Sequence, residues 1–151
     1  MPKEQEPKIR KKDIYAEELG INLKSGKEKE FFKWFLACLL FGKPIQQEVA
    51  KMAYFEFEKA GLLSTGEILK AGWDKLVEIL DRGHYVRYDF STATKLLEVS
   101  KDLQQRYGSV SALLREAKNR RDLESRILEF KGVGPVTARI FIKGLKARGK
   151  P

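Results

Sequence analysis

Hydrophobic residues recur along most of the chain at intervals of three and four positions, the spacing of one face of an α-helix. No window alternates apolar and polar residues strictly enough to predict a β-strand. Glycine, proline and serine divide the pattern into a short helix capped by Ser64 and helices over residues 28–41, 46–60, 73–80, 89–107, 110–117, 121–130 and 135–147. The sequence therefore predicts an all-α fold, a compact bundle or barrel of eight or nine short helices.

Residues 28–41 are apolar nearly all the way round the expected helix, which is typical of a central helix that other helices surround. The only cysteine, Cys38, falls inside this helix. We expect it to be a small buried side chain and not a reactive thiol. A single cysteine also excludes a disulfide within the chain.

The chain reads as one helical domain over residues 13–147, between a mobile polar arm (1–12) and a basic tail (148–151). Its longest apolar stretch, residues 35–41, is much shorter than the roughly 18 residues that a membrane-spanning helix needs. There is no signal-peptide pattern at the N-terminus. We expect a cytoplasmic protein with no membrane partner.

The positive charge is concentrated at one end of the chain. The formal net charge is +9, yet residues 1–30 are nearly neutral, with eight Lys and Arg against seven Asp and Glu. Residues 131–151 hold six cations and no carboxylate. Because solvated helix faces usually mix both signs, this bias favours a partner that carries phosphates.

The acid-free segment begins with the stretch FKGVGPVTARIF, residues 130–141, between two expected helices. Gly132 is expected to be left-handed at the end of the first helix, Gly134 to turn the chain without a Cβ clash, and Pro135 to begin the second. The free N–H groups near residues 133–136 would then bind a phosphate. The simpler alternative is a compact helix connection that binds nothing.

The same residues, Gly132 to Ala138, resemble the helix-hairpin-helix of the HhH-GPD superfamily, the DNA glycosylases related to endonuclease III, whose pattern is roughly L-P-G-V-G-x-x-T-A. Residues 83–87, GHYVR, are similar to a second segment of that family. The resemblance implies a helix-hairpin-helix near the C-terminus that binds duplex DNA, damaged or intact, on the nucleoid. The implied DNA-binding residues are Lys131, Gly132, Val133, Gly134, Pro135, Val136, Thr137, Arg139 and Lys143.

Two catalytic groups of the family have no counterpart in this sequence. Val136 stands where bifunctional members carry the lysine that forms a Schiff base with the sugar. The family's aspartate, about eighteen residues further on, would fall beyond Pro151. The cysteines that hold an iron–sulfur cluster would also fall there, so no such cofactor is expected, although the resemblance allows a monovalent cation at the hairpin. The main hypothesis is therefore a DNA-binding protein related to repair glycosylases that is non-catalytic or uses relocated groups.

Three alternatives stay open. The chain could be a reduced glycosylase or lyase, with Glu48 or Asp89 as relocated acids, although both occupy helix starts where acids serve a structural role. It could be one half of a split enzyme, or a dimer, whose partner covers an exposed apolar patch near Ile142 and Leu145. Residues 54–57, YFEF, could dock a protein, although their helical spacing fits a core equally well.

Overall fold

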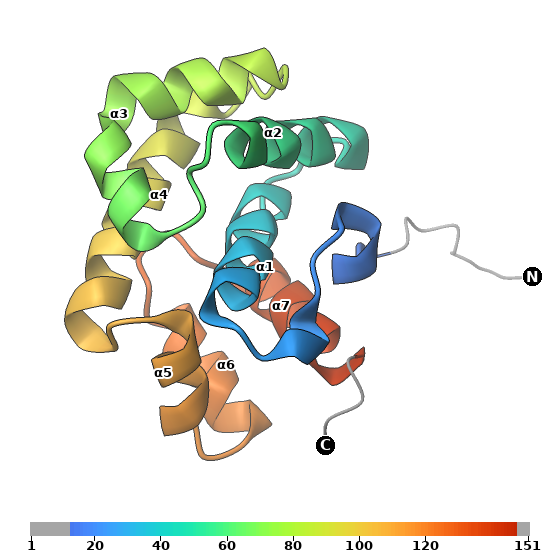
Figure 1. Ribbon diagram of the computed structural model, residues 1–151, viewed down its shortest axis with the longest axis vertical. Coiled ribbons are helices and arrows are strands. Elements are labelled where there is room, and N and C mark those ends of the chain that lie inside the picture. The colour runs from blue at the N-terminus through green and yellow to red at the C-terminus, as the bar shows by residue number, and fades with distance from the viewer. Residues whose placement is uncertain (1–12, 148–151) are drawn as a thin grey trace, which may run out of the picture.

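The computed structural model describes residues 13–147, which form seven α-helices and two short 3-10 turns and contain no strand (Figure 1). The elements are η2 (Ala16–Leu19), η3 (Leu23–Ser25), α1 (Glu28–Phe41), α2 (Gln47–Lys59), α3 (Thr65–Arg82), α4 (Asp89–Arg106), α5 (Val110–Glu116), α6 (Arg120–Leu128) and α7 (Pro135–Ala147). The all-α expectation is confirmed. The expected polar arm and basic tail lie outside the described residues.

The helix count is lower than expected because two expected helices form one element. Inside α3, Gly72 has the non-helical values φ 81° and ψ 170°, so the expected break between the two helices is present as a kink at this residue. The expected cap at the start of α3 is present, since the Ser64 hydroxyl accepts a hydrogen bond from the N–H of Glu67 at 3.1 Å.

The expected central helix is α1, which lies in the middle of the molecule (Figure 1) and packs against α2, α5, α7 and η3. Ten of its side chains are buried. Cys38 is completely buried among them, and this burial raises the pKa of its thiol well above the ordinary value. The prediction of a buried and unreactive cysteine is consistent with this position.

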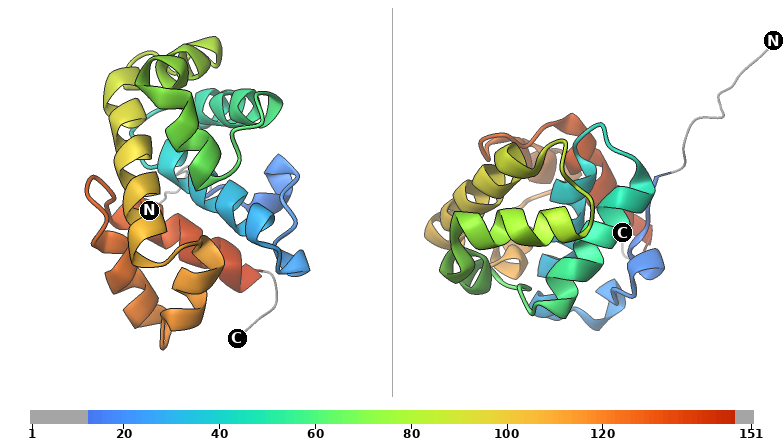
Figure 2. Two further views of the ribbon diagram at one scale, coloured as in Figure 1. Left: turned by 60° about the vertical axis from the view of Figure 1, so that its left-hand side comes forward. Right: turned by 90° about the horizontal axis from the view of Figure 1, so that it is seen from above.

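The other helices form two groups around α1. Helices α2 and α3 lie at one end of the molecule, α5 and α6 lie at the other, and α4 runs along one side between them (Figure 2). Helix α7 packs against both α1 and α6. The indole N–H of Trp34 in α1 donates a hydrogen bond to the carbonyl of Phe141 in α7 at 3.0 Å, so the two helices are fixed in register deep in the core.

Candidate nucleic-acid interface

The segment between α6 and α7 is a tight turn beside α4, as both Figure 1 and Figure 2 show. Gly132 has φ 83°, so the predicted left-handed residue is confirmed. The N–H of Val133 donates to the carbonyl of Phe130 at 3.1 Å and closes the turn. The first bond of α7 runs from Ala138 N–H to the Gly134 carbonyl at 3.2 Å, which places Pro135 at the first helical position, as expected.

Gly134 was expected to be a glycine because a Cβ would clash in the turn, and this expectation is wrong. Its backbone is not left-handed, and an added Cβ would meet no atom within 4 Å. The N–H of Val133 is not free either, because it closes the turn. The N–H groups of Gly134, Val136 and Thr137 make no backbone hydrogen bond among the described residues. These three N–H groups are the donors that the turn offers to an anion.

The side chains of the expected DNA-binding residues divide between surface and core. Lys131, Gly132, Pro135 and Val136 are exposed, whereas Val133 and Thr137 are buried. Thr137 faces the end of α1, where its hydroxyl oxygen lies only 2.1 Å from the position that a Cβ at Gly42 would take. The buried pair therefore holds the turn against α1, and the surface residues present it to solvent.

Arg139 and Lys143, the expected DNA-binding residues further along α7, are both paired with Asp13. A single oxygen of the Asp13 carboxylate lies 2.5 Å from an Arg139 nitrogen and 3.0 Å from Lys143 Nζ. Burial alone would raise the Asp13 pKa, but the hydrogen bonds from Arg139 and Lys143 outweigh it and hold that pKa below its ordinary value. This contact was not predictable from a local pattern, since Asp13 is far from α7 along the chain.

A groove of about 880 Å³ runs along the exposed side of α7 and begins at the hairpin turn. Its apolar lining includes Pro135, Val136 and Ile142. Its charged lining is four cations and one carboxylate: Arg120, Arg139, Lys143, Lys146 and Glu124. The groove therefore suits an anionic ligand with an apolar part.

The two candidate acids are elsewhere. Glu48 is exposed in the first turn of α2. Asp89 begins α4, and its carboxylate accepts a hydrogen bond from the N–H of Phe90 at 2.7 Å. Asp89 also hydrogen-bonds Asp81 and raises the pKa of that carboxyl. Neither Glu48 nor Asp89 lines the groove, so the structure does not bring them together with the hairpin.

The carbonyls at the end of α1 are capped by two side chains from the region of α4. The Tyr85 hydroxyl donates to the Leu40 carbonyl at 2.6 Å, and Lys95 Nζ donates to the Leu39 carbonyl at 3.1 Å. Sequence reasoning missed Lys95. The signal was its place on the buried face of α4, between Thr92 and Val99 at helical spacing, where a lysine is unexpected.

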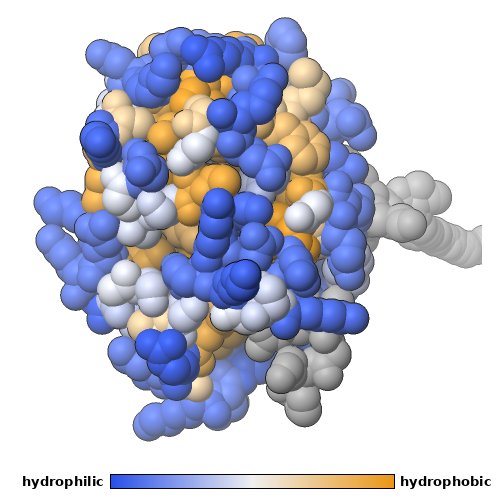
Figure 3. Space-filling model, in the orientation of Figure 1, coloured by the Kyte–Doolittle hydropathy of each residue, from blue (hydrophilic) through white to orange (hydrophobic). Residues whose placement is uncertain are grey.

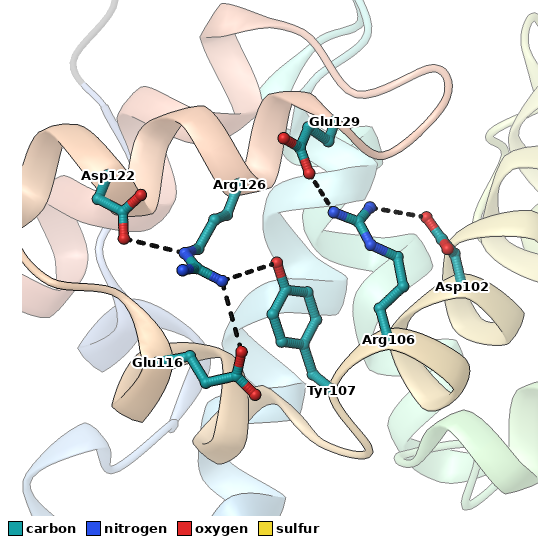
Figure 4. A network of polar contacts seen from close by, with 7 residues as sticks. All are labelled: Asp102, Arg106, Tyr107, Glu116, Asp122, Arg126 and Glu129. Atoms are coloured by element: carbon teal, nitrogen blue, oxygen red, sulfur yellow. Dashed lines mark hydrogen bonds and ion pairs between the residues drawn. The ribbon is translucent and has the colours of Figure 1, made fainter.

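A polar network fixes the helix that enters the turn (Figure 4). Arg106 of α4 pairs with Asp102 and with Glu129, the residue that follows α6. Arg126 of α6 pairs with Asp122 at 2.9 Å and with Glu116 at 3.5 Å. Exposed ion pairs contribute little one by one, yet a shared network orders its members. This network ties the entrance of the hairpin to α4 and α5.

The two residues near which we expected an exposed apolar patch for a partner chain are themselves nearly buried. Ile142 and Leu145 are each only 9% exposed. On the face drawn in Figure 3, apolar side chains form separate areas between hydrophilic ones. In residues 54–57, Tyr54 and Phe57 are completely buried, so that cluster belongs mainly to the core.

No protein-family model, curated protein or solved structure matches this chain. Among the described residues, no helix is long and apolar enough to cross a membrane. The same part of the chain has no group of three or more His, Cys, Asp or Glu placed to hold a metal ion.

Proposed function

We propose that this protein binds duplex DNA through the α6–α7 hairpin, as a helix-hairpin-helix protein related to the base-excision-repair glycosylases. The observation that carries the proposal is the turn itself. A left-handed Gly132 leads into a helix start with three N–H groups that have no backbone partner. Such a helix start favours a phosphate through its donors and its macrodipole.

The surrounding charge supports a polyanionic ligand. Every charged residue from 131 onward is a cation, and Lys131 is exposed at the turn. The groove along α7 continues this positive surface. Because Val136 has no amine, the hairpin binds DNA in this proposal without forming a Schiff base.

A reduced glycosylase is the second candidate, and the groove is the observation that favours it. The groove begins at Pro135 and Val136 and has room for a small ligand. Among the described residues, one carboxylate, that of Glu124, lines the groove. Base release would therefore need a new role for Glu124 or a group supplied from outside the described residues.

Replacing Gly134 by Ala gives the sharpest test of the hairpin. The added Cβ has open space in the free protein, so the thermal midpoint should stay unchanged. A phosphate at the N–H of Gly134 would approach this position closely, so the Kd for a 20-base-pair duplex, read by fluorescence anisotropy, should rise at least about fivefold, or 1 kcal/mol. The matched control is Gly66→Ala, since Gly66 also has open space.

Two outcomes would contradict the proposal. Absence of duplex binding by the unmodified protein at low salt would remove DNA as the ligand, because nonspecific binding alone usually has a Kd of about 10⁻⁴ to 10⁻⁶ M at physiological salt. Equal affinity of the unmodified protein and the Gly134→Ala variant would show that DNA binds to another surface.

A further inference from the structure

Lys95 is a buried cation without a carboxylate to balance it. The residue is 6% exposed, and no carboxylate of the described residues lies within 4.0 Å of its Nζ. Its recorded partner is the Leu39 carbonyl at the end of α1. A buried ammonium group that has only a carbonyl partner is costly, because the carbonyl replaces little of the lost hydration.

A second lysine makes the position of Lys95 still less favourable. Burial, followed by repulsion from Lys43, lowers the pKa of Lys95 to about 8. Lys43 belongs to the loop after α1, and its Nζ lies 5.3 Å from the centre of the Tyr88 ring. The positive charge of Lys43 therefore acts on Lys95, and an anion bound nearby would offset this repulsion.

The hairpin turn is directly beside Lys95. The Cδ and Cγ atoms of Lys95 lie 3.5 and 3.6 Å from the position of a Cβ at Gly132. Thus the aliphatic stem of Lys95 packs against Gly132, the left-handed residue of the turn. The ammonium nitrogen of Lys95 is two bonds beyond its Cδ atom. Gly134, two residues after Gly132, is the first residue of the turn whose N–H has no backbone partner.

We propose that Lys95, together with Lys43, completes the anion site of the α6–α7 turn by adding buried positive charge behind the N–H groups that receive a DNA phosphate. The proposal rests on the proposed function, since it names a further residue of the same site. Lys95 acts through its charge and its contact with Gly132. It is not a nucleophile here, because Nζ is buried and donates to the Leu39 carbonyl.

The competing explanation for the buried position of Lys95 is that it only caps the C-terminal end of α1. A cation at a helix C-terminus is favourable, and Lys95 satisfies a carbonyl there. A neutral donor would satisfy the same carbonyl without repulsion from Lys43. The two roles differ in what they predict, because capping changes stability alone, whereas an anion site makes DNA affinity depend on the charge of Lys95.

The test measures the Kd for a 20-base-pair duplex from pH 6.5 to 9.5 at constant ionic strength. Lys95 has a lowered pKa, so its charge is present below about pH 8 and is lost as pH rises through that value. The unmodified protein should therefore lose about tenfold in affinity across this range. Lys95→Met keeps the stem without the charge and should bind about tenfold more weakly at pH 6.5, with a flat profile through pH 8.

Further variants separate charge from packing. Lys95→Gln keeps a donor but no charge, so it should behave as Lys95→Met does in DNA binding whatever its stability. Lys101→Met removes an exposed charge from the same helix and should keep the profile of the unmodified protein. The other titratable groups of the chain remain in every variant and cancel in the comparison.

Each outcome of these measurements either supports or contradicts the role of Lys95 in the anion site. A fall in affinity near pH 8 that disappears in both Lys95 variants supports the inference. A folded Lys95→Met or Lys95→Gln variant with the profile of the unmodified protein overturns it while the proposed function stands. No duplex binding at any pH by the unmodified protein overturns both, and Gly134→Ala binding as tightly as the unmodified protein removes the hairpin from the interface.

Discussion

Gly144 lies where α7 crosses the indole ring of Trp34. An ideal Cβ at this residue would be 2.4 Å from Cζ2 and 2.6 Å from Nε1 of that ring. Trp34 is completely buried and has no room to move away. Overpacking of this kind costs about 1–3 kcal/mol. We therefore predict that Gly144→Ala lowers the free energy of unfolding by that amount, measured by urea denaturation.

Gly66→Ala is the control for this prediction. Gly66 lies in the first turn of α3, and the nearest atom to its Cβ position is 3.9 Å away. Alanine should be neutral there or stabilise the helix by up to about 1 kcal/mol. Equal destabilisation by both substitutions would mean that the contact between Gly144 and Trp34 is not the cause.

These glycines show what a sequence can predict about a single residue. The left-handed conformation of Gly132 was predictable, because the residue type and the local pattern of a helix end specify it. The need for glycine at positions 42 and 144 was not predictable. A Cβ at either position would clash with a side chain from a distant part of the chain. The expectation that Gly134 avoids a Cβ clash was wrong, because the free space around a backbone position depends on tertiary packing that the local pattern does not specify.

In α7, two of the three cations are already paired with a carboxylate. Asp13 holds Arg139 and Lys143, so only Lys131 and Lys146 of the described cations from residue 131 onward are unpaired with a carboxylate. Each phosphate neutralised changes the slope of log K against log salt by about −0.9. Two phosphate contacts would give the unmodified protein a slope of about −1.8.

We predict that Asp13→Asn steepens this slope to about −3.6, because two more cations become available, and raises duplex affinity at low salt. The measurement is a salt titration of binding. The Asp13 pKa is lowered, so its carboxylate stays charged at neutral pH, and this contact is lost only as pH falls through that lowered value. Glu17→Gln, at an exposed acid of η2, removes the same charge and should change nothing. Identical slopes for the unmodified protein and the Asp13→Asn variant would show that Arg139 and Lys143 do not reach phosphates.

The helices themselves were largely predictable. The limits of α1 and α7 agree with the sequence pattern, because apolar periodicity and Gly or Pro punctuation are local signals. The break expected before Trp73 is present as the kink at Gly72, where the backbone is not helical. Asp13 and Lys95 were missed because their partners are set by tertiary packing.

At the scale of the whole molecule, the sequence indicated a helical domain around α1 but not which helices meet. The hydrogen bond from Trp34 to Phe141 joins residues on either side of the chain's midpoint, and no local pattern specifies it. The same holds for the groove, whose walls come from α6, α7 and Tyr15, the residue before η2. The interface is therefore a product of tertiary packing built on a locally encoded turn.

The packed domain also predicts the outcome of a test for catalysis. Duplexes that carry uracil, an alkylated purine, an oxidised pyrimidine or an abasic site are incubated with excess protein for a single turnover and read with and without hot alkali. We expect no strand breaks above the protein-free background. Val136 has no amine that could form a Schiff base. Among the described residues, the groove is lined by one carboxylate and four cations. A glycosylase that excises uracil serves as the positive control.

Breaks would contradict this expectation in an informative way. Alkali-dependent breaks would mean base release, and Glu124→Gln, Glu48→Gln and Asp89→Asn would then identify the acid. Loss of activity in Glu124→Gln alone would place the chemistry in the groove, since Glu124 lines it and the other two do not. Breaks without alkali at base lesions would require an amine nucleophile, and Lys146 and Lys143 are the lysines that line the groove. Trapping with borohydride would reveal such an amine directly, because it fixes the imine to the lysine that formed it.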